Sequence, residues 1–418
     1  MKRYLLSCLA ICLSVVVGFQ IIRIWRGVTL SQKGYTRESL LHAAKLDPSN
    51  PDPFHKLGLF YQWNLLEFDL PESARYFERA IKRNPLEQEY WLNLARILHR
   101  MGKAAPSERA LDNAILVFPT SYRGRWVAGN LLLQRGELER ALPHFSYILS
   151  QYPSQSSLVY NVWEKAVDDP DFILERLIPG NPSSLNHYLA YLYGVRDLES
   201  AKKAWAKLAA LGYEADRRET IRHIDFLISC GELAEACHLW RARLREEGLA
   251  PPSDGNLVTN GGFEKETVLG GGFDWGIGTV AGADISFDHT VAFEGRSSLR
   301  ISFNGEENLD FHHVYQYVAL KPGTDYLLTA RMRTEALTTK SGLKVEVVGV
   351  GPASRRFRSA SEPLTGDNAW RKITVPFRTP THSQGAMIRL RRTRTDKFDR
   401  FISGTVWIDD VHIGEGKE

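Results

Sequence analysis

The sequence predicts a multidomain protein of the α plus β class: an N-terminal transmembrane helix, an α-helical repeat solenoid, and a C-terminal β-sandwich of the jelly-roll kind. Three observations predict this order. Residues 4–22 carry no charge and are mostly apolar. Prolines then recur at a near-constant interval through the helical part. Beyond Pro252, short alternating segments bounded by Gly, Pro, Asn and Asp replace the helical pattern.

Composition limits the classes of function. A chain of 418 residues with 43% hydrophobic and 24% charged residues is long enough for two or three globular domains. Its 53 basic and 49 acidic residues leave a net charge of +4, which is too small for a protein that neutralises a phosphate backbone. We therefore expect no nucleic-acid partner. The four cysteines match neither a disulfide framework nor a metal-binding knuckle.

The N-terminal apolar run is long enough to cross a membrane. At about 1.5 Å per residue, it just spans a hydrocarbon layer of about 30 Å. Arg23, Trp25 and Arg26 follow it with side chains that favour the interface, and no small-residue cleavage site comes after it. We expect a retained signal anchor in residues 1–30, with a removed signal peptide as the alternative. Basic residues flank both ends of the run, so charge alone does not set the orientation.

The helical part repeats with a period of 34 residues. Pro85, Pro119 and Pro153 are separated by that interval, whereas Pro48 precedes Pro85 by 37. A three-residue insertion in "WNLLEFDLPES" accounts for the longer spacing. Two helices cross closely only where a small side chain faces a large one. The tenth residue after Pro48, Pro85 and Pro119 is small in each case: Gly58, Ala95 and Gly129.

Period and pattern together resemble the tetratricopeptide repeat family, with five or six units across residues 36–248. The resemblance implies a concave face, lined by the first helix of each hairpin, that holds a peptide or a partner protein. An ordinary solvated role is the alternative for each candidate on that face: Asn93, Arg96, Arg125, Asn130 and Tyr160. Five tryptophans at helical spacing are expected in hairpin cores: Trp91, Trp126, Trp163, Trp205 and Trp240.

The C-terminal part, residues 254–415, contains eight or more segments that each predict a strand with one buried face, as in a jelly-roll sandwich. Its motifs follow one another in the order "NLVTNGGFE", "DW", "EGRSSLRI", "VYQYVALKPGTDYLLTARMRT", "AWRKITVPFRTP" and "GTVWIDDVHI". This order resembles the carbohydrate-binding modules of families 4, 9 and 22 over residues 256–413. By the same resemblance, Trp275, Trp370 and Trp407 are expected to pack in the core.

The resemblance also implies a structural calcium ion, the single cofactor that we expect. By position, Glu264 of the first strand and Asp410 of the last are the residues that would hold it. Calcium prefers carboxylate and carbonyl oxygens from several chain segments. A salt-bridged strand end is the alternative for this pair.

A sugar site needs aromatic rings for stacking and planar polar groups for paired hydrogen bonds. Strand alternation places one candidate set on a single face, opposite Val314 and Val318: Phe311, His313, Tyr315 and Tyr317. Arg389 and Arg391 share one face of a later strand, in a segment with six basic and two acidic residues between positions 389 and 400. They would suit an anionic polysaccharide, and a charged strand edge is the alternative.

These features predict a non-catalytic scaffold in the assembly or export of a bacterial envelope polysaccharide or exopolysaccharide. It would cross the inner membrane once, with its soluble part in the periplasm. One alternative is a protein-protein adaptor whose sandwich no longer binds sugar. A glycosidase is the third hypothesis, but it needs two carboxylates about 5 to 10 Å apart across a cleft. The adjacent pairs Glu264 with Glu266 and Asp409 with Asp410 do not suit those roles.

Overall fold

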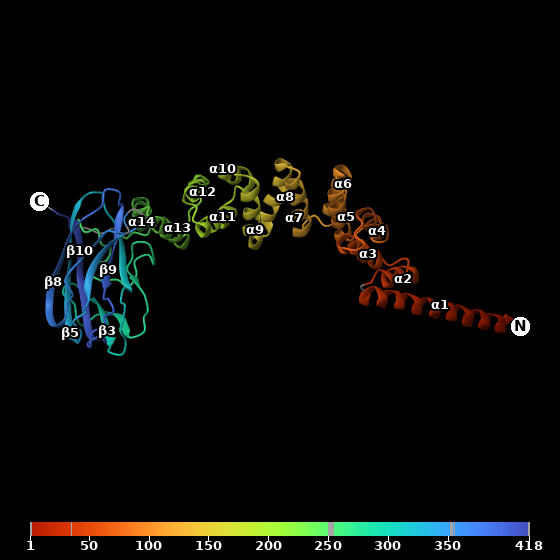
Figure 1. The fold of residues 1–418 in the computed structure, drawn as a ribbon. Helices are drawn as coiled ribbons and strands as arrows, with labels where there is room; N and C mark the ends of the chain where they lie inside the picture. Colours follow the sequence, from red (N-terminus) through yellow and green to blue (C-terminus); the bar gives the residue numbers. More distant parts are fainter. Residues whose placement is uncertain (1, 35, 250–254, 352–353, 355, 417–418) are drawn as a thin grey trace. The chain divides into compact units, whose positions relative to one another are not determined.

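The computed structural model describes residues 2–34, 36–249, 255–351, 354 and 356–416. It confirms the predicted fold class, because helices fill the N-terminal part and strands the C-terminal part (Figure 1). The helices are α1 (Lys2–Lys33), α2 (Arg37–Leu46), α3 (Asp52–Trp63), α4 (Leu70–Arg83), α5 (Gln88–Arg100), α6 (Ala104–Val117), α7 (Tyr122–Gln134), α8 (Leu138–Gln151), α9 (Ser156–Ala166), α10 (Pro170–Phe172), α11 (Pro182–Val195), α12 (Leu198–Ala210), α13 (Arg217–Cys230) and α14 (Leu233–Glu246), with the short turns η1 (Pro153–Gln155) and η2 (Ile173–Leu177).

The chain divides into two compact units. The first holds residues 1–191 and 203–211, and the second holds residues 192–202 and 212–418. The second unit therefore contains α13 and α14 as well as all the strands. The change from helix to strand along the sequence does not coincide with the division between the compact units.

Helix α1 contains the apolar N-terminal run. Its segment 7–33 is long and apolar enough to cross a membrane, with a mean hydropathy of 2.1 and no burial over the most apolar stretch. The last turns of α1 pack against the repeats: a Cβ atom on Gly27 would lie 2.9 Å from the Cβ atom of Asp47, and Lys56 donates a hydrogen bond to the Ser31 carbonyl. The C-terminal end of α1 is thus part of the first helical layer.

The small residues of the repeats lie where large aromatic rings cross them. A Cβ atom on Gly58 would lie 2.6 Å from Phe77 Cε1, and one on Gly129 would lie 2.5 Å from Phe145 Cε2. The Ser73 hydroxyl donates to the Gly58 carbonyl at 2.7 Å across the same contact. These contacts confirm the predicted role of the small positions, because any side chain there would push the paired helices apart.

The tryptophans divide into two groups. Trp163 and Trp240 are fully buried, as predicted. Trp91, Trp126 and Trp205 are only half-buried, so these three are less enclosed than predicted. Trp91 nevertheless packs against the hydrophobic core of the early repeats. Helical spacing places residues on one face of a helix, but it does not say whether a neighbouring helix covers that face.

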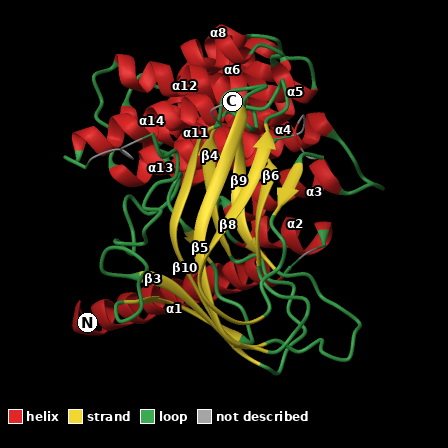
Figure 2. Cartoon of the chain, turned by 90° about the vertical axis from the view of Figure 1, so that its left-hand side faces the viewer, coloured by secondary structure: helices red, strands yellow, loops and turns green. Residues whose placement is uncertain are grey.

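The strands form two antiparallel five-stranded sheets, drawn in yellow in Figure 2, in the orders β1-β4-β9-β6-β7 and β2-β3-β10-β5-β8. We call the first the β4 sheet. Large apolar side chains from both sheets, such as Val314 and Leu328, fill the core between them. The strands are β1 (Gly276–Ile277), β2 (Ala283–Asp288), β3 (Ser298–Asn304), β4 (Val314–Ala319), β5 (Asp325–Leu337), β6 (Lys344–Gly349), β7 (Arg358–Ala360), β8 (Gly366–Arg378), β9 (Gly385–Arg391) and β10 (Ser403–Glu415).

The helix pair α13–α14 packs directly on the sandwich. Leu269 and Phe273, from the segment before β1, enter the hydrophobic cluster that surrounds Trp240. The Gly272 amide donates to Asp225 Oδ1 at 2.8 Å beside this cluster. The predicted boundary between the helical part and the sandwich, at Pro251 and Pro252, lies outside the described residues. Because a terminal helix pair of a repeat array needs a cover over its apolar face, the segment 269–273 serves α13–α14 as that cap.

Replacing Phe273 by Ala tests this contact. The cavity left in the cluster should destabilise the α13–α14 packing by about 3 to 5 kcal/mol. Hydrogen exchange of the α13 and α14 amides, measured on the full chain in detergent, should therefore speed up. Phe398→Ala is the control, because Phe398 is fully exposed and its loss should leave the exchange unchanged. Equal exchange in both variants would mean that the cap does not stabilise the hairpin.

Candidate functional site

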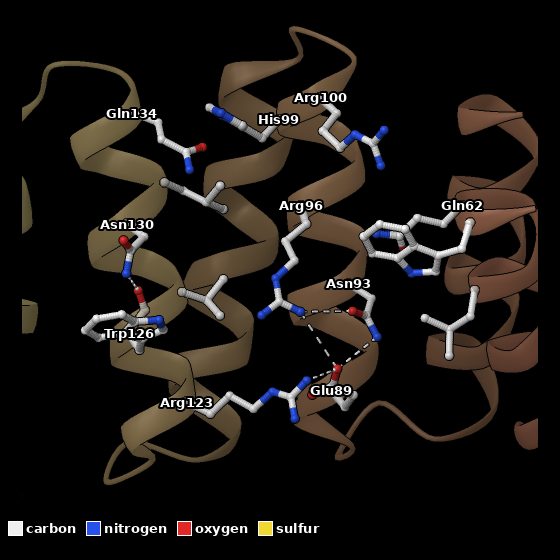
Figure 3. A pocket seen from close by; sticks show the side chains of 14 residues that line it. Gln62, Glu89, Asn93, Arg96, His99, Arg100, Arg123, Trp126, Asn130 and Gln134 are labelled. Carbon is white, nitrogen blue, oxygen red and sulfur yellow. Dashed lines mark hydrogen bonds and ion pairs between the residues drawn. The ribbon is translucent and has the colours of Figure 1, made fainter. Parts of the chain in front are cut away.

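The first helices of the early repeats line an open pocket of about 750 Å³ (Figure 3). Helix α3 supplies Leu59, Gln62 and Trp63 to its wall. Helices α5 and α7 supply the remaining side chains: Glu89, Asn93, Arg96, His99 and Arg100 from α5, and Arg123, Trp126, Val127, Asn130, Leu131 and Gln134 from α7. The pocket therefore combines apolar and aromatic walls with a dense set of polar groups.

Glu89 is the centre of the polar network in this pocket. Its Oε1 atom accepts hydrogen bonds from Arg123 Nη2 at 2.7 Å and from Asn93 Nδ2 at 3.0 Å, and it lies 3.9 Å from Arg96 Nη1. Arg96 in turn donates to Asn93 Oδ1 at 3.2 Å. Burial lowers the pKa of Arg96, although the negative charge of Glu89 acts in the opposite direction. One carboxylate thus holds two guanidinium groups in place, and Arg100 adds a third to the wall.

Three of the five residues predicted for the concave face line this pocket: Asn93, Arg96 and Asn130. Arg125 does not, because it donates to the Pro119 carbonyl and lies over the Tyr147 ring, 4.6 Å from its centroid. Tyr160 is buried, with its ring 5.0 Å from that of Tyr188. The prediction of an exposed surface residue is wrong for Tyr160 and also for the largely buried Asn93, whose amide nevertheless serves the network.

Three further residues of the pocket were not among the predicted site residues: Glu89, Arg123 and Trp126. For Glu89, the spacing along α5 was an available signal, because Glu89, Asn93 and Arg96 follow one another at intervals of four and three residues on one face of that helix. Trp126 shares a face of α7 with Asn130, whose amide donates to the Trp126 carbonyl at 2.8 Å. Trp126 was expected in the core, but its half-exposed ring forms a wall of the pocket.

The second candidate surface is the outer face of the β4 sheet. Val314 and Val318 point into the core, as predicted, so His313, Tyr315 and Tyr317 lie on the outer side and are half-buried. Phe311 does not join them: it precedes β4, is fully buried and packs edge-on against Phe303 in the core. The prediction of Phe311 as a sugar-stacking residue is therefore wrong, because strand alternation does not extend beyond the strand itself.

The two tyrosines of this face are partly covered by the chain. The Tyr315 ring lies over β1, where a Cβ atom on Gly276 would come within 2.5 Å of its Cζ atom. Tyr317 packs against the cluster between α13 and α14, and burial raises its pKa. A ligand on the outer face would reach Tyr315 more readily than Tyr317.

Arg389 and Arg391 lie on the same outer face, and each is held by a carboxylate. Arg389 Nε donates to Glu346 Oε2 at 2.7 Å, and Glu346, only 1% exposed, also pairs with Arg358. Arg391 Nη1 lies 2.6 Å from Asp310 Oδ1. These pairs neutralise much of the positive charge expected from the sequence, so an anionic sugar would have to compete with Glu346 and Asp310.

In the structure, each residue of the expected calcium pair has a partner of its own. Asp410 lies 3.7 Å from the Arg331 guanidinium, while Glu264 accepts a hydrogen bond from the Arg296 amide at 2.8 Å. Among the described residues, no three His, Cys, Asp or Glu side chains are grouped to hold a metal ion. Calcium binding stays a prediction.

Asp409 is a buried support for the loop before β3. Its carboxylate accepts hydrogen bonds from the amides of Phe293, Glu294 and Asp410, although burial raises its pKa. We expect Asp409→Asn to destabilise the sandwich by about 1 to 3 kcal/mol, because an amide would leave a buried donor unpaired. Asp410→Asn should cost less than about 1 kcal/mol, since its ion pair is half-exposed.

Hydrogen exchange of β10 and of residues 293–297 in the full chain checks this difference. Equal protection in the two variants would show that Asp409 does not support this loop. The same measurement on the unsubstituted chain with and without chelator tests whether calcium contributes.

The architecture defines a helical-repeat protein with an appended β-sandwich. Residues 69–105 and 100–156 match the tetratricopeptide repeat family. The chain therefore contains tetratricopeptide repeats, as predicted, and α5 and α7 lie within the matched residues.

Comparisons with other proteins cover parts of the chain. The tRNA(Glu)-specific nuclease WapA of Bacillus subtilis subsp. natto (strain BEST195) is 23% identical over 167 residues, which is 39% of this chain and 7% of that protein's length. A MamA structure is 16% identical with a TM-score of 0.28, covering 47% of this chain and 96% of that one. The xylan-binding domain CBM22-1 of Paenibacillus barcinonensis Xyn10C is 15% identical with a TM-score of 0.27, covering 40% and 99%.

Proposed function

We propose that this chain is a non-catalytic, membrane-anchored scaffold whose repeats hold a partner protein and whose sandwich engages a polysaccharide. Its process is the assembly or export of a bacterial envelope polysaccharide or exopolysaccharide. One chain combines three features: the exposed apolar helix α1, the pocket between α3, α5 and α7, and the outer face of the β4 sheet with Tyr315. This combination is the observation that carries the proposal. Repeat surfaces suit protein partners, and exposed aromatic rings suit sugar rings.

The second candidate function is a protein-protein adaptor whose sandwich binds no sugar. Two observations favour it. Arg389 is held by Glu346, and Tyr317 is partly covered by the helix pair α13–α14. Both reduce the polar and aromatic surface that a glycan could contact. The adaptor would use the repeats in the same way as the scaffold, so the two functions differ in the sandwich alone.

Affinity gel electrophoresis separates these two functions. We expect the full chain in detergent to be retarded in a gel that contains bacterial exopolysaccharide, and Tyr315→Ala to lose about tenfold in affinity, since one stacking ring contributes about 1 to 2 kcal/mol. Phe401→Ala is the control, because the Phe401 ring is exposed and comes just before β10, which belongs to the other sheet. Absence of retardation with neutral and with anionic polysaccharides would favour the adaptor.

Protease accessibility tests the proposed location. We propose a single pass through the inner membrane, with the N-terminus inside and the repeats and sandwich in the periplasm. A protease added to spheroplasts that express the full chain should then digest the sandwich and leave the N-terminal α1 segment protected by lipid. A sandwich that stays intact until the spheroplasts are lysed would place it in the cytoplasm and contradict the proposal.

A further inference from the structure

The packing of α1 on the first repeat sets how far that repeat stands from a membrane. Helix α2 runs back along α1, so Asp47, just after its C-terminal end, lies beside Gly27. Lys56 of α3 contacts Ser31, about one turn farther from the apolar run. The apolar run ends at Ile22, so Gly27 lies about 7 Å beyond it at about 1.5 Å per residue. The headgroup layer on each side of a hydrocarbon core is about 5 to 7 Å thick. With α1 in a bilayer, the turn between α2 and α3 therefore lies at the depth of the lipid headgroups.

The C-terminal end of α4 belongs to the same edge of the repeats. Arg83 Nε donates to the Pro48 carbonyl at 2.6 Å. The Arg83 guanidinium also lies over the Phe54 ring, with Cζ 3.7 Å from the ring centroid. The end of α4 and the turn between α2 and α3 are thus held together. We call the resulting surface the α1 edge, and it consists of residues 23–27, 45–52 and 78–87.

The basic side chains of the α1 edge have no ion-pair partners. The edge contains six basic and four acidic residues. Among the described residues, none of the six basic side chains forms an ion pair: Arg23, Arg26, Lys45, Arg79, Lys82 and Arg83. Burial and the neighbouring charge of Arg79 lower the pKa of Arg83. Two like charges are therefore held near each other at the end of α4.

The acidic side chains of the α1 edge are mostly engaged with the chain itself. Three of the four accept hydrogen bonds from neighbouring groups: Asp47, Asp52 and Glu87. The fourth, Glu78, is exposed. The edge therefore presents more positive than negative charge to an incoming group.

Exposed apolar side chains accompany these charges. Leu86, in the turn after α4, is 77% exposed, and Trp25 of α1 is 66% exposed. Tryptophan favours the boundary between lipid and water. Apolar side chains beside basic ones are typical of surfaces that lie on anionic membranes.

We propose that the α1 edge docks on the anionic phospholipid headgroups of the membrane that α1 crosses. Arg79 and Lys82 pair with lipid phosphates, and Leu86 inserts between the headgroups. The docking holds the first repeat against the bilayer, so the repeats leave the membrane in a fixed direction. The inference rests on the membrane anchor of the proposed function and names the lipid chemistry that the first repeat contacts.

Hydrogen exchange of the full chain in lipid nanodiscs tests the docking. We expect the amides of residues 47–51 and 84–87 to exchange more slowly in discs of phosphatidylcholine mixed with phosphatidylglycerol than in discs of phosphatidylcholine alone. High salt should remove the difference, because it screens the charges. Inorganic phosphate added to phosphatidylcholine discs should not slow the exchange, because the ligand is a headgroup held beside α1.

A charge-matched pair of double variants separates docking from net charge. Arg79→Gln with Lys82→Gln removes two exposed charges of the edge and should lower the ratio of docked to undocked chain about 30-fold. Arg75→Gln with Lys103→Gln is the control. Arg75 lies farther from the end of α4 and pairs with Glu72, and Lys103 follows the opposite end of α5. The control should keep the slow exchange in anionic discs.

The outcomes separate the docking from the anchor. Equal exchange in the two kinds of disc would overturn the docking and leave the anchor standing. The same holds for slower exchange with inorganic phosphate alone, or for an equal loss of protection in the control. A chain that does not elute with the nanodiscs would overturn the membrane anchor of the proposed function together with the docking.

Discussion

The contact between a glycine and an aromatic ring fixes the geometry of the helical part. At Gly58 and Gly129 there is no room for a side chain, because Phe77 and Phe145 occupy that space. The backbones of paired helices therefore approach closely, and the Ser73 hydroxyl ties the Gly58 carbonyl to the neighbouring helix. This packing sets how far apart the two helices of a hairpin lie, α3 from α4 and α7 from α8, and α3 and α7 in turn supply walls of the pocket.

The pocket shows that a locally charged surface can form in a chain whose net charge is only +4. A carboxylate and an amide on one face of α5 position the guanidinium groups of Arg96 and Arg123. Both groups are held in place before any partner arrives, which lowers the conformational entropy lost on binding. The positive charge is local, since ion pairs elsewhere on the repeats, such as Arg140 with Glu108, balance their own members.

The sandwich depends on a different constraint: other segments of the chain have to cover part of its surface. The segment 269–273 inserts into the cluster around Trp240, and α13–α14 in turn covers part of Tyr317. A helix pair from the repeats has thus become part of the packing of the sandwich unit. The same contact limits the outer face of the β4 sheet to the region around Tyr315 and His313, while Glu346 and Asp310 hold the nearby arginines.

The sequence by itself determined the order of the three parts, the repeat period, the small contact positions and the inward direction of Val314 and Val318. These follow from local rules, because periodicity and residue size act along a single helix or strand. Tertiary structure alone decided that Phe311 and Tyr160 are buried, that Trp126 forms a pocket wall, and that Asp409 rather than Asp410 supports a loop. Each depends on which distant segment covers a residue, and a pattern along one element carries no information about that segment.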